Sequence, residues 1–230
     1  MRLSIIIPVY NESKWIARTV HHLFHFGGDL VKEIIVVDGQ SEDNTVEMAQ
    51  KAGAQVFISC LRGRAAQMDC GAKRALGDTL YFVHADTLPP ETFAQDIAQA
   101  LERGHLLGNF RYHFDGGPWL LKINAFCTRF HWFFTHGGDR TFYIKSEVYR
   151  SIGGYDPLDS IMEEYILLRK AKARGYTVRI IPKDCVVSAR KYYRNSWPRV
   201  QLANLVVFVF WTTGWASGPT LKQWYRQWLH

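Results

Sequence analysis

Four acidic side chains have the type and spacing to do chemistry. Asp38 and Asp86 each follow an apolar run, and the pair Glu163-Glu164 opens a helical pattern. A carboxylate at the end of a strand can accept hydrogen bonds from a nucleobase or a ribose hydroxyl, or hold a hard cation that bridges two phosphates. A carboxylate that stands in a cleft can act as a general base. Taken singly, such residues are usually helix caps or turn residues, so it is their order along the chain that favours a site.

The elements that would position these side chains alternate between strands and helices. Apolar, β-branched runs predict strands at 3–9, 33–37, 55–59 and 79–83. The segments between them predict helices at 13–26, capped by Ser13, at 43–52 and at 62–75. This alternation indicates βαβ units and a mostly parallel sheet, so the fold class is α/β. Ligands bind beyond the carboxyl ends of such strands, which is where Asp38 and Asp86 fall.

The second half of the chain has a less regular pattern. It predicts strands at 107–114, 141–144 and 178–181, the last ended by Pro182, an aromatic-rich helix at 119–134, and a helix at 162–174 stopped by Gly175. No repeat or low-complexity linker interrupts the 230 residues, a length that suits one α/β domain. We therefore expect a single domain over 1–230.

The basic charge is concentrated in one stretch. The net charge is +7, but residues 169–199 carry ten Lys or Arg against Asp184 alone, which leaves −2 for the remainder. This distribution disfavours a uniformly cationic coat for nucleic acid, so we expect no nucleic-acid partner, and it favours a local surface that faces an anion. Runs of charged residues usually face water, so Arg190 could instead be a solvated surface residue.

The four cysteines are scattered, without a C-x-x-C pair or a Cys/His cluster at zinc spacing. This argues against a disulfide scaffold or a structural zinc site and suits a reducing compartment, so we expect a cytoplasmic protein. The apolar run in residues 1–8 is too short for a signal peptide and lacks a small-residue cleavage site. It predicts a first strand instead.

An uncharged stretch of 22 residues, 200–221, has three readings. Its length would permit a span, but polar residues, glycines and a proline interrupt it, which favours a buried or amphipathic helix. The basic and aromatic flanks at 190–199 and 224–228 keep a third reading open, a helix that lies on an anionic bilayer. The expected location is therefore cytoplasmic, with peripheral contact at the inner face of the membrane as an option.

Several segments, in this order, resemble family 2 glycosyltransferases. The resemblance is carried by SIIIPVYNES at 4–13, VDGQSEDNT at 37–45, RAAQM at 64–68, GD at 77–78, FVHADT at 82–87, GDR at 138–140, GGY at 153–155 and MEE at 162–164. The His-Ala-Asp triplet at 84–86 and Ser-Ala-Arg at 188–190 are similar to a bacterial subgroup, some members of which are associated with arsenosugar biosynthesis. One such motif would be weak, but this many in one order is a strong signal.

The resemblance implies a GT-A fold, a mostly parallel Rossmann-like sheet flanked by helices, with a C-terminal helical extension. Residues 1–100 would mainly bind the nucleotide, 101–199 would mainly form the acceptor side, and 200–230 would be apolar C-terminal helices. The partners would be a nucleoside diphosphate sugar and a hydroxyl acceptor, which can be lipid-linked, and the cofactor would be Mg²⁺ or Mn²⁺. Such a cation acts as a Lewis acid on the departing phosphate oxygens.

Site residues carry over from the resemblance by motif position. Those expected at the nucleotide are Pro8, Tyr10, Glu12, Asp38, Arg64, His84 and Asp86. Of these, Asp38 would accept from the base, and Asp86 would hold the metal. Arg190 would contact the diphosphate, and Gly138, Asp139 and Arg140 would contact the acceptor.

The expected reaction is one in-line displacement that inverts the anomeric carbon, with Glu164 as general base. Glu164 stands where relatives usually have Asp, so Glu163 is the alternative base. His84 stands where many relatives have a first Asp, which lowers the charge available to a metal. Two other functions stay open: a polyprenyl-phosphate glycosyltransferase at the membrane surface, and a non-enzymatic basic membrane-binding module. A nucleotidyltransferase should instead carry a Gly-rich loop after the first strand.

Overall fold

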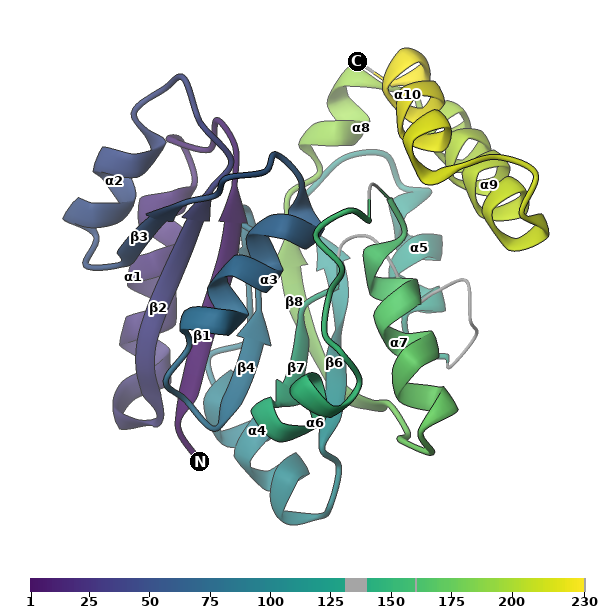
Figure 1. Cartoon of the computed structure of the whole chain (residues 1–230). Coiled ribbons are helices and arrows are strands. Elements are labelled where there is room, and N and C mark those ends of the chain that lie inside the picture. The colour runs from purple at the N-terminus through teal and green to yellow at the C-terminus, as the bar shows by residue number, and fades with distance from the viewer. Residues whose placement is uncertain (131–139, 160, 230) are drawn as a thin grey trace.

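The computed structural model describes residues 1–130, 140–159 and 161–229 (Figure 1). In this part of the chain the strands form one mixed sheet in the order β3-β2-β1-β4-β7-β6-β8-β5. The strands are β1 (Leu3–Val9), β2 (Val31–Asp38), β3 (Gln55–Ile58), β4 (Thr79–Phe82), β5 (Thr87–Leu88), β6 (Leu107–Phe114), β7 (Phe142–Lys145) and β8 (Arg179–Val187). Strands β3, β2, β1 and β4 are parallel, β7 runs antiparallel to β4 and β6, and β8 is parallel to β6. The mostly parallel α/β sheet predicted from the sequence is confirmed.

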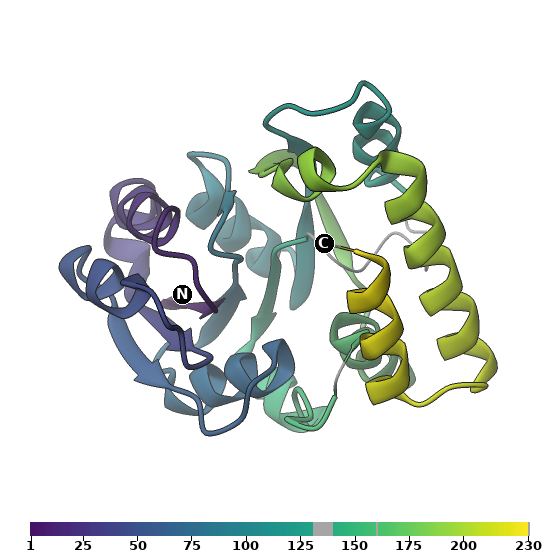
Figure 2. The same cartoon turned by 90° about the horizontal axis from the view of Figure 1, so that it is seen from above.

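Helices cover both faces of this sheet (Figures 1 and 2). They are α1 (Ile16–Gly27), α2 (Thr45–Lys51), α3 (Arg64–Arg74), α4 (Phe93–Glu102), α5 (Leu121–Cys127), α6 (Ser146–Ser151), α7 (Glu163–Ala173), α8 (Arg190–Arg194), α9 (Trp197–Thr213) and α10 (Gly218–Trp228), with a 3-10 turn at Gly28–Leu30. One core joins the sheet to α1 and α4, and a second joins it to α3, α6 and α7.

Strand β1 shows why the sequence folds this way. All seven of its residues are buried, with Ile5 and Ile7 in the core beneath α1 and Ile6 in the core beneath α3. A central parallel strand has both faces covered, so it reads as a continuous apolar run rather than an alternating one. Each fully buried aliphatic side chain contributes about 1.5–3 kcal/mol, which makes β1 a rigid base for the loop that follows it.

Three local expectations were wrong. Ser13 does not cap the first helix, because its backbone N–H donates to Asp43 and the helix begins only at Ile16. The aromatic helix expected at 119–134 ends at Cys127, where the next N–H groups bond three residues back in tight turns, and 131–134 lie outside the described residues. Strand β8 continues through Pro182 because the register with β6 shifts there, and such a bulge does not need the missing N–H.

The C-terminal residues form a helical hairpin. Helix α9 ends at Gly214, whose φ of 72° suits glycine, and α10 starts after Ser217 with Pro219 in its first turn. Within the described ranges, no helix is long and apolar enough to cross a membrane. The spanning interpretation of 200–221 is therefore wrong. Figure 2 shows α10 on the side of the hairpin that faces the centre of the molecule and α9 on the outer side.

The cations of 169–199 go to separate places instead of forming one surface. The Arg169 guanidinium lies over the Trp211 ring of α9, with 4.5 Å to the ring centroid. The ammonium of Lys183 pairs with Asp96 of α4 at 2.7 Å. Arg190 enters the carboxylate network described below, while its side chain stays 43% exposed to solvent.

Candidate functional site

A buried glutamine bridges the ends of β1 and β2. The side-chain amide of Gln67, on α3, donates to the carbonyls of Val9 at 2.7 Å and Val37 at 2.8 Å. The backbone N–H of Gly39 also donates to the Val9 carbonyl, at 2.8 Å. These bonds satisfy the last carbonyls of the strands and fix where the next loops leave the sheet.

Hydrogen bonds join the two loops that follow β1 and β2. The N–H of Asn11 donates to Ser41 Oγ at 2.9 Å, and Asn11 Oδ1 accepts from the N–H of Glu42 at 2.8 Å. Asn11 and Gln40 both have left-handed backbones, with φ of 55° and 68°. Such conformations cost energy in a residue other than glycine and gather at functional sites.

The first acidic candidate, Asp38, ends β2 and is 1% exposed. Its carboxylate accepts from the N–H of Ser41 at 2.9 Å and from the Ser41 hydroxyl. In the structure it therefore holds the turn, and the base-binding role stays a prediction. Pro8 is buried in β1 opposite Val37, whereas the Tyr10 ring is exposed and lies 5.7 Å from the Arg62 guanidinium.

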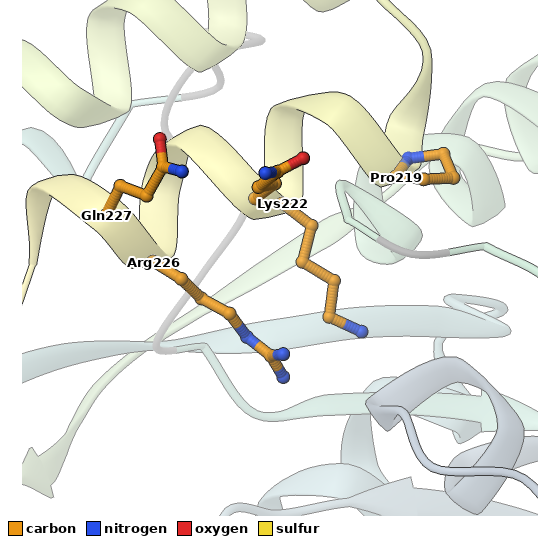
Figure 3. A pocket seen from close by; sticks show the side chains of 5 residues that line it. Pro219, Lys222, Arg226 and Gln227 are labelled. Atoms are coloured by element: carbon orange, nitrogen blue, oxygen red, sulfur yellow. The ribbon is translucent and has the colours of Figure 1, made fainter.

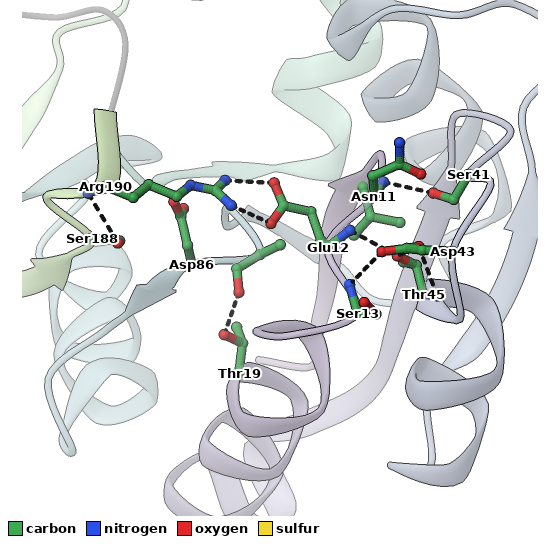
Figure 4. A network of polar contacts seen from close by, with 12 residues as sticks. Asn11, Glu12, Ser13, Thr19, Ser41, Asp43, Thr45, Asp86, Ser188 and Arg190 are labelled. Carbon is green, nitrogen blue, oxygen red and sulfur yellow. Dashed lines mark hydrogen bonds and ion pairs between the residues drawn. The ribbon is translucent and has the colours of Figure 1, made fainter. Parts of the chain in front are cut away.

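Arg190 joins the two carboxylates that follow β1 and β4. Its Nη1 and Nη2 donate to the two oxygens of Glu12 at 2.6 and 2.5 Å, and its Nε lies 2.9 Å from Asp86 Oδ2 (Figure 4). A fork-to-fork pair of this kind is the strongest geometry for a guanidinium and a carboxylate. The structure thus brings together three residues that the sequence analysis had placed at the nucleotide, the metal and the diphosphate.

A short strand explains how residues about a hundred positions apart meet. Strand β5 begins directly after Asp86 and pairs antiparallel with the end of β8, three residues before Arg190. The N–H of Ser188 donates to the Asp86 carbonyl at 3.2 Å. The sequence analysis missed β5 because a strand of two residues leaves no periodic signal.

Arg64 gathers the other pair of carboxylates. At the start of α3, its Nε lies 3.2 Å from Glu163 Oε1, and its Nη2 donates to Glu164 and lies 3.2 Å from His84 Nε2. Glu163 and Glu164 open α7, directly after Met162, whose φ of 64° is strained for a side chain of this kind. The strained turn aims the first two residues of α7 at α3.

Behind Glu164 lies a small cavity whose walls are partly polar and partly apolar. Its lining includes Glu164, Arg140, Tyr155 and Asn109. Arg140 is 4% exposed and donates to Asn109 Oδ1 at 2.8 Å and to the Thr128 carbonyl, and burial lowers the pKa of its guanidinium to about 10. The Nε of Arg140 and the hydroxyl of Tyr155 are buried with no hydrogen-bond partner among the described residues.

Of the motif at 138–140 that was expected to contact the acceptor, the structure describes only Arg140. Arg140 lies inside the protein, behind the proposed base, rather than on an open surface. Gly138 and Asp139 fall outside the described residues.

The donor set suits a cation that binds together with a diphosphate. Across the described ranges, no three His, Cys, Asp or Glu side chains gather so as to hold a metal ion. Asp86 offers one carboxylate, which Arg190 already contacts. Mg²⁺ commonly takes one or two protein carboxylates and completes its shell with substrate phosphates and water. Asp86 fits that arrangement, provided that a diphosphate supplies the other oxygens.

The charge of the site supports the same conclusion. Four carboxylates, Glu12, Asp86, Glu163 and Glu164, face two guanidinium groups, Arg64 and Arg190, for a formal charge of −2. A net negative site repels an anionic ligand at short range. A divalent cation would cancel this charge, so the residues present fit Mg²⁺ or Mn²⁺.

Comparison with known families decides the membership of the chain. The sequence pattern of the family described as "Glycosyl transferase family 2" matches residues 4–156, about two thirds of the sequence. The chain belongs to glycosyl transferase family 2. The matched range of this family 2 chain contains Glu12, Asp38, Arg64 and Asp86, whereas Glu163, Glu164 and Arg190 lie beyond it.

Two relatives of this family 2 chain have names that contain a lipid phosphate. It is 29% identical over 109 residues to a dolichol-phosphate mannosyltransferase of Pyrococcus furiosus, covering 45% of this chain and 31% of that protein. It is 29% identical over 120 residues to an undecaprenyl-phosphate 4-deoxy-4-formamido-L-arabinose transferase of Salmonella choleraesuis, covering 48% and 37%. The chain thus spans about a third of the length of these relatives.

Solved structures share the fold. A mannosyltransferase of Pyrobaculum calidifontis in complex with GDP-Man and Mn²⁺ superposes with a TM-score of 0.70 at 19% identity, covering 98% of this chain and 68% of the other. Glucosyl-3-phosphoglycerate synthase of Mycobacterium tuberculosis, with Mg²⁺ and UDP, gives 0.62 at 18% identity, covering 89% and 78%. At these identities the likeness establishes the GT-A type of fold, which the sequence analysis had predicted.

Proposed function

We propose that this chain is an inverting glycosyltransferase that moves a sugar from a nucleoside diphosphate sugar to a hydroxyl acceptor with the help of Mg²⁺ or Mn²⁺. The observation that carries the proposal is the contact of Arg190 with both Glu12 and Asp86 at the carboxyl edge of the parallel strands. That edge is where open α/β sheets bind nucleotides. The family membership, and relatives that bind GDP-Man or UDP with a metal, support it.

In this proposal the donor lies along the loops after β1, β2 and β4. Tyr10 and Asp38 contact the base, Glu12 contacts the ribose, and Arg64 and His84 line the path toward the sugar. Residues 1–100 serve mainly the nucleotide and 101–199 mainly the acceptor, as one domain over 1–230. The His-Ala-Asp and Ser-Ala-Arg triplets support placement in the arsenosugar-associated subgroup, which stays a prediction.

Asp86 would hold the cation, which supplies Lewis-acid stabilisation of the leaving diphosphate when bound. The Arg190 guanidinium pairs with the Asp86 carboxylate in this structure, and a diphosphate would offer that guanidinium another anionic partner. Arg190 can therefore turn from Glu12 and Asp86 toward the phosphate oxygens as the donor enters. We expect the metal and the nucleotide to bind together rather than independently.

The chemistry then needs one base and one in-line displacement. Glu164 accepts the proton of the acceptor hydroxyl while that oxygen forms its bond to the anomeric carbon. The bond from that carbon to the diphosphate breaks, and its electron pair leaves with the phosphate oxygen, which Arg190 stabilises. Glu164 is preferred to Glu163 because it lines the cavity with Arg140 and Tyr155, and its side chain is the more exposed, at 12% against 7%.

A lipid-linked acceptor is the second candidate, and the outer surface of the C-terminal hairpin favours it. Helix α9 exposes Leu202, Leu205 and Val209 along one side, and Trp215 at its end is 81% exposed. Exposed apolar patches of this kind mark contacts with a membrane or a partner. We propose peripheral contact with an anionic membrane at its cytoplasmic face, and two relatives that are named for lipid-phosphate acceptors support a lipid-linked acceptor.

The test is release of nucleoside diphosphate from UDP-, GDP-, CDP- and dTDP-sugars, each with and without Mn²⁺. The proposal expects metal-dependent release from one base class, and loss of release in Asp86→Asn with the fold intact. Release from no donor would contradict it and leave the non-enzymatic membrane-binding module. Binding to phosphatidylglycerol vesicles, compared with Leu205→Ser, separates the lipid candidate from a fully soluble acceptor.

A further inference from the structure

Helix α10 presents a polar face to an open groove at the surface of the protein. Pro219, Lys222, Gln223, Arg226 and Gln227, spaced three and four apart, line an open groove on one side of the helix. The opposite side carries Leu221, which is fully buried, and Trp224, whose ring meets Phe210 of α9. An amphipathic surface helix normally points its polar face to solvent. Helix α10 follows this rule, because Pro219, Gln223, Arg226 and Gln227 are exposed and only Lys222 is half-buried, so the groove is open to a ligand from solvent.

The groove holds two cations that the protein does not neutralise. Lys222 and Arg226, one turn apart, extend from the same side of α10 (Figure 3). Neither forms an ion pair with any residue in the described ranges. Like charges at this spacing destabilise a helix by about 0.2–0.5 kcal/mol. An anion between the two side chains would remove this repulsion.

The cations face the half of the site that contains the proposed base. The Lys222 ammonium lies 3.9 Å from the point that a Cβ on Gly63 would occupy, directly before Arg64. Burial lowers the pKa of Lys222, the charge of Arg226 acts in the same direction, and the negative charge of Glu163 opposes both. Lys222 is therefore within electrostatic reach of Glu163, the first residue of α7.

We propose that Lys222 and Arg226 bind a phosphate group carried by the acceptor. The proposal rests on the proposed function, since it assigns the acceptor side of that same site. The donor diphosphate has its own cation in Arg190, at the Asp86 side of the network. An anion at α10 lies instead beside α3 and Glu163, on the side from which an acceptor approaches. Specificity then comes from α10, a segment outside the range of the family match.

Two kinds of molecule carry this chemistry. In a soluble phosphorylated acceptor, the phosphate is a handle, and a hydroxyl elsewhere attacks the anomeric carbon and gives its proton to Glu164. In a lipid phosphate, a phosphate oxygen attacks directly, the bond to the donor diphosphate breaks, and no proton has to leave. The exposed apolar side of α9, on the outer side of the same hairpin, would suit the second kind.

The experiment measures transfer to two matched pairs of acceptors, glycerol 3-phosphate against glycerol and farnesyl phosphate against farnesol. The donor is the nucleotide sugar that the chain hydrolyses. The variant is Lys222→Ala with Arg226→Ala, and the control is Lys172→Ala with Arg174→Ala, two exposed cations at the end of α7 whose loss changes the charge equally. Slow transfer of the sugar to water reports on the donor site in every variant.

The proposal expects a preference for the phosphorylated member of one pair, which identifies the soluble or the lipid source. In the double variant, KM for that acceptor rises about 100-fold, or about tenfold for each charged hydrogen bond. The KM for the unphosphorylated member, the kcat and the donor hydrolysis stay near wild type, as do all values in the control. Gln223→Ala, an uncharged change on the same face, leaves KM within about threefold.

Three results overturn the proposal in distinguishable ways. A chain that hydrolyses its donor but prefers neither phosphorylated acceptor, or whose double variant keeps the wild-type KM, overturns the inference and leaves the proposed function standing. A chain that hydrolyses no nucleotide sugar overturns both. Equal losses in the double variant and in the control mean a general charge effect, which also contradicts a specific site on α10.

Discussion

Removing Arg64 should destabilise the fold through the two carboxylates that it gathers. The side chains of Glu163 and Glu164 are 7% and 12% exposed, whereas that of Arg64 is 41% exposed. Breaking a buried ion pair costs about 3–5 kcal/mol, but an exposed pair contributes less than about 1 kcal/mol. Because solvent reaches the guanidinium, we expect Arg64→Ala to lower the free energy of unfolding by about 1–2 kcal/mol near neutral pH.

The assay is urea unfolding of Arg64→Ala, of Glu163→Gln and of the double variant. The cost comes from a buried negative charge left without its partner, so the double variant should recover about half of the loss. Lys172→Ala, which removes an exposed cation of α7, should change stability by less than about 0.5 kcal/mol. An equally small change in Arg64→Ala would refute this account of the cluster.

Three further outcomes follow from named contacts. Glu164→Gln should lower transfer to a hydroxyl acceptor about 10²- to 10⁴-fold and leave nucleotide binding unchanged, which steady-state kinetics and calorimetry would measure. Gly77→Ala would place a Cβ 2.4 Å from the Arg2 carbonyl oxygen, so it should cost about 1–3 kcal/mol and lower Tm by roughly 2–4 °C per kcal/mol. Partial burial raises the pKa of Asp43, but hydrogen bonds from Thr45 and Ser13 prevail and lower it to about 2. This depressed pKa adds stability above about pH 4 that is lost as pH falls toward 2, so Asp43→Asn should flatten that part of an acid-unfolding curve.

Each of these outcomes has a result that would contradict it. A larger fall in transfer for Glu163→Gln than for Glu164→Gln would move the base role to Glu163. An unchanged Tm in Gly77→Ala would mean that β1 and the loop before β4 can separate at little cost. An Asp43→Asn protein with the same acid-unfolding curve as the wild type would show that this carboxylate does not set the pH dependence.

The nucleotide-binding half could be predicted because its signals are local. Each strand from β1 to β4 is an apolar run, and the parallel order places Asp38 and the residues after β1 and β4 at one edge. The expected helix after β1 lost its first turn to a tertiary contact of Ser13 that no propensity contains. Helix α4 was missed although its apolar residues recur at helical spacing, since no motif drew attention to it.

For the site itself, the sequence predicted which residues take part but not which of them contact one another. The types of Glu12, Asp86 and Arg190 were identified, but their junction depends on the two-residue strand β5 and on a register shift at Pro182 in β8. Arg140 was expected to face the acceptor, and its burial with Asn109 comes from packing that the sequence does not display. The cations of α10 were not singled out because their meaning depends on the direction in which the hairpin folds back.

The central claim is that the network of Glu12, Asp86 and Arg190 is a metal-assisted site for a nucleoside diphosphate. Isothermal titration calorimetry of UDP and GDP, with and without Mn²⁺, tests it most directly. The account predicts that one of them binds with Mn²⁺ at least about tenfold more tightly than without it, that Mn²⁺ alone gives little heat, and that Asp86→Asn abolishes the difference. Failure of both nucleotides to bind with Mn²⁺, or binding that Asp86→Asn leaves unchanged, would contradict the account.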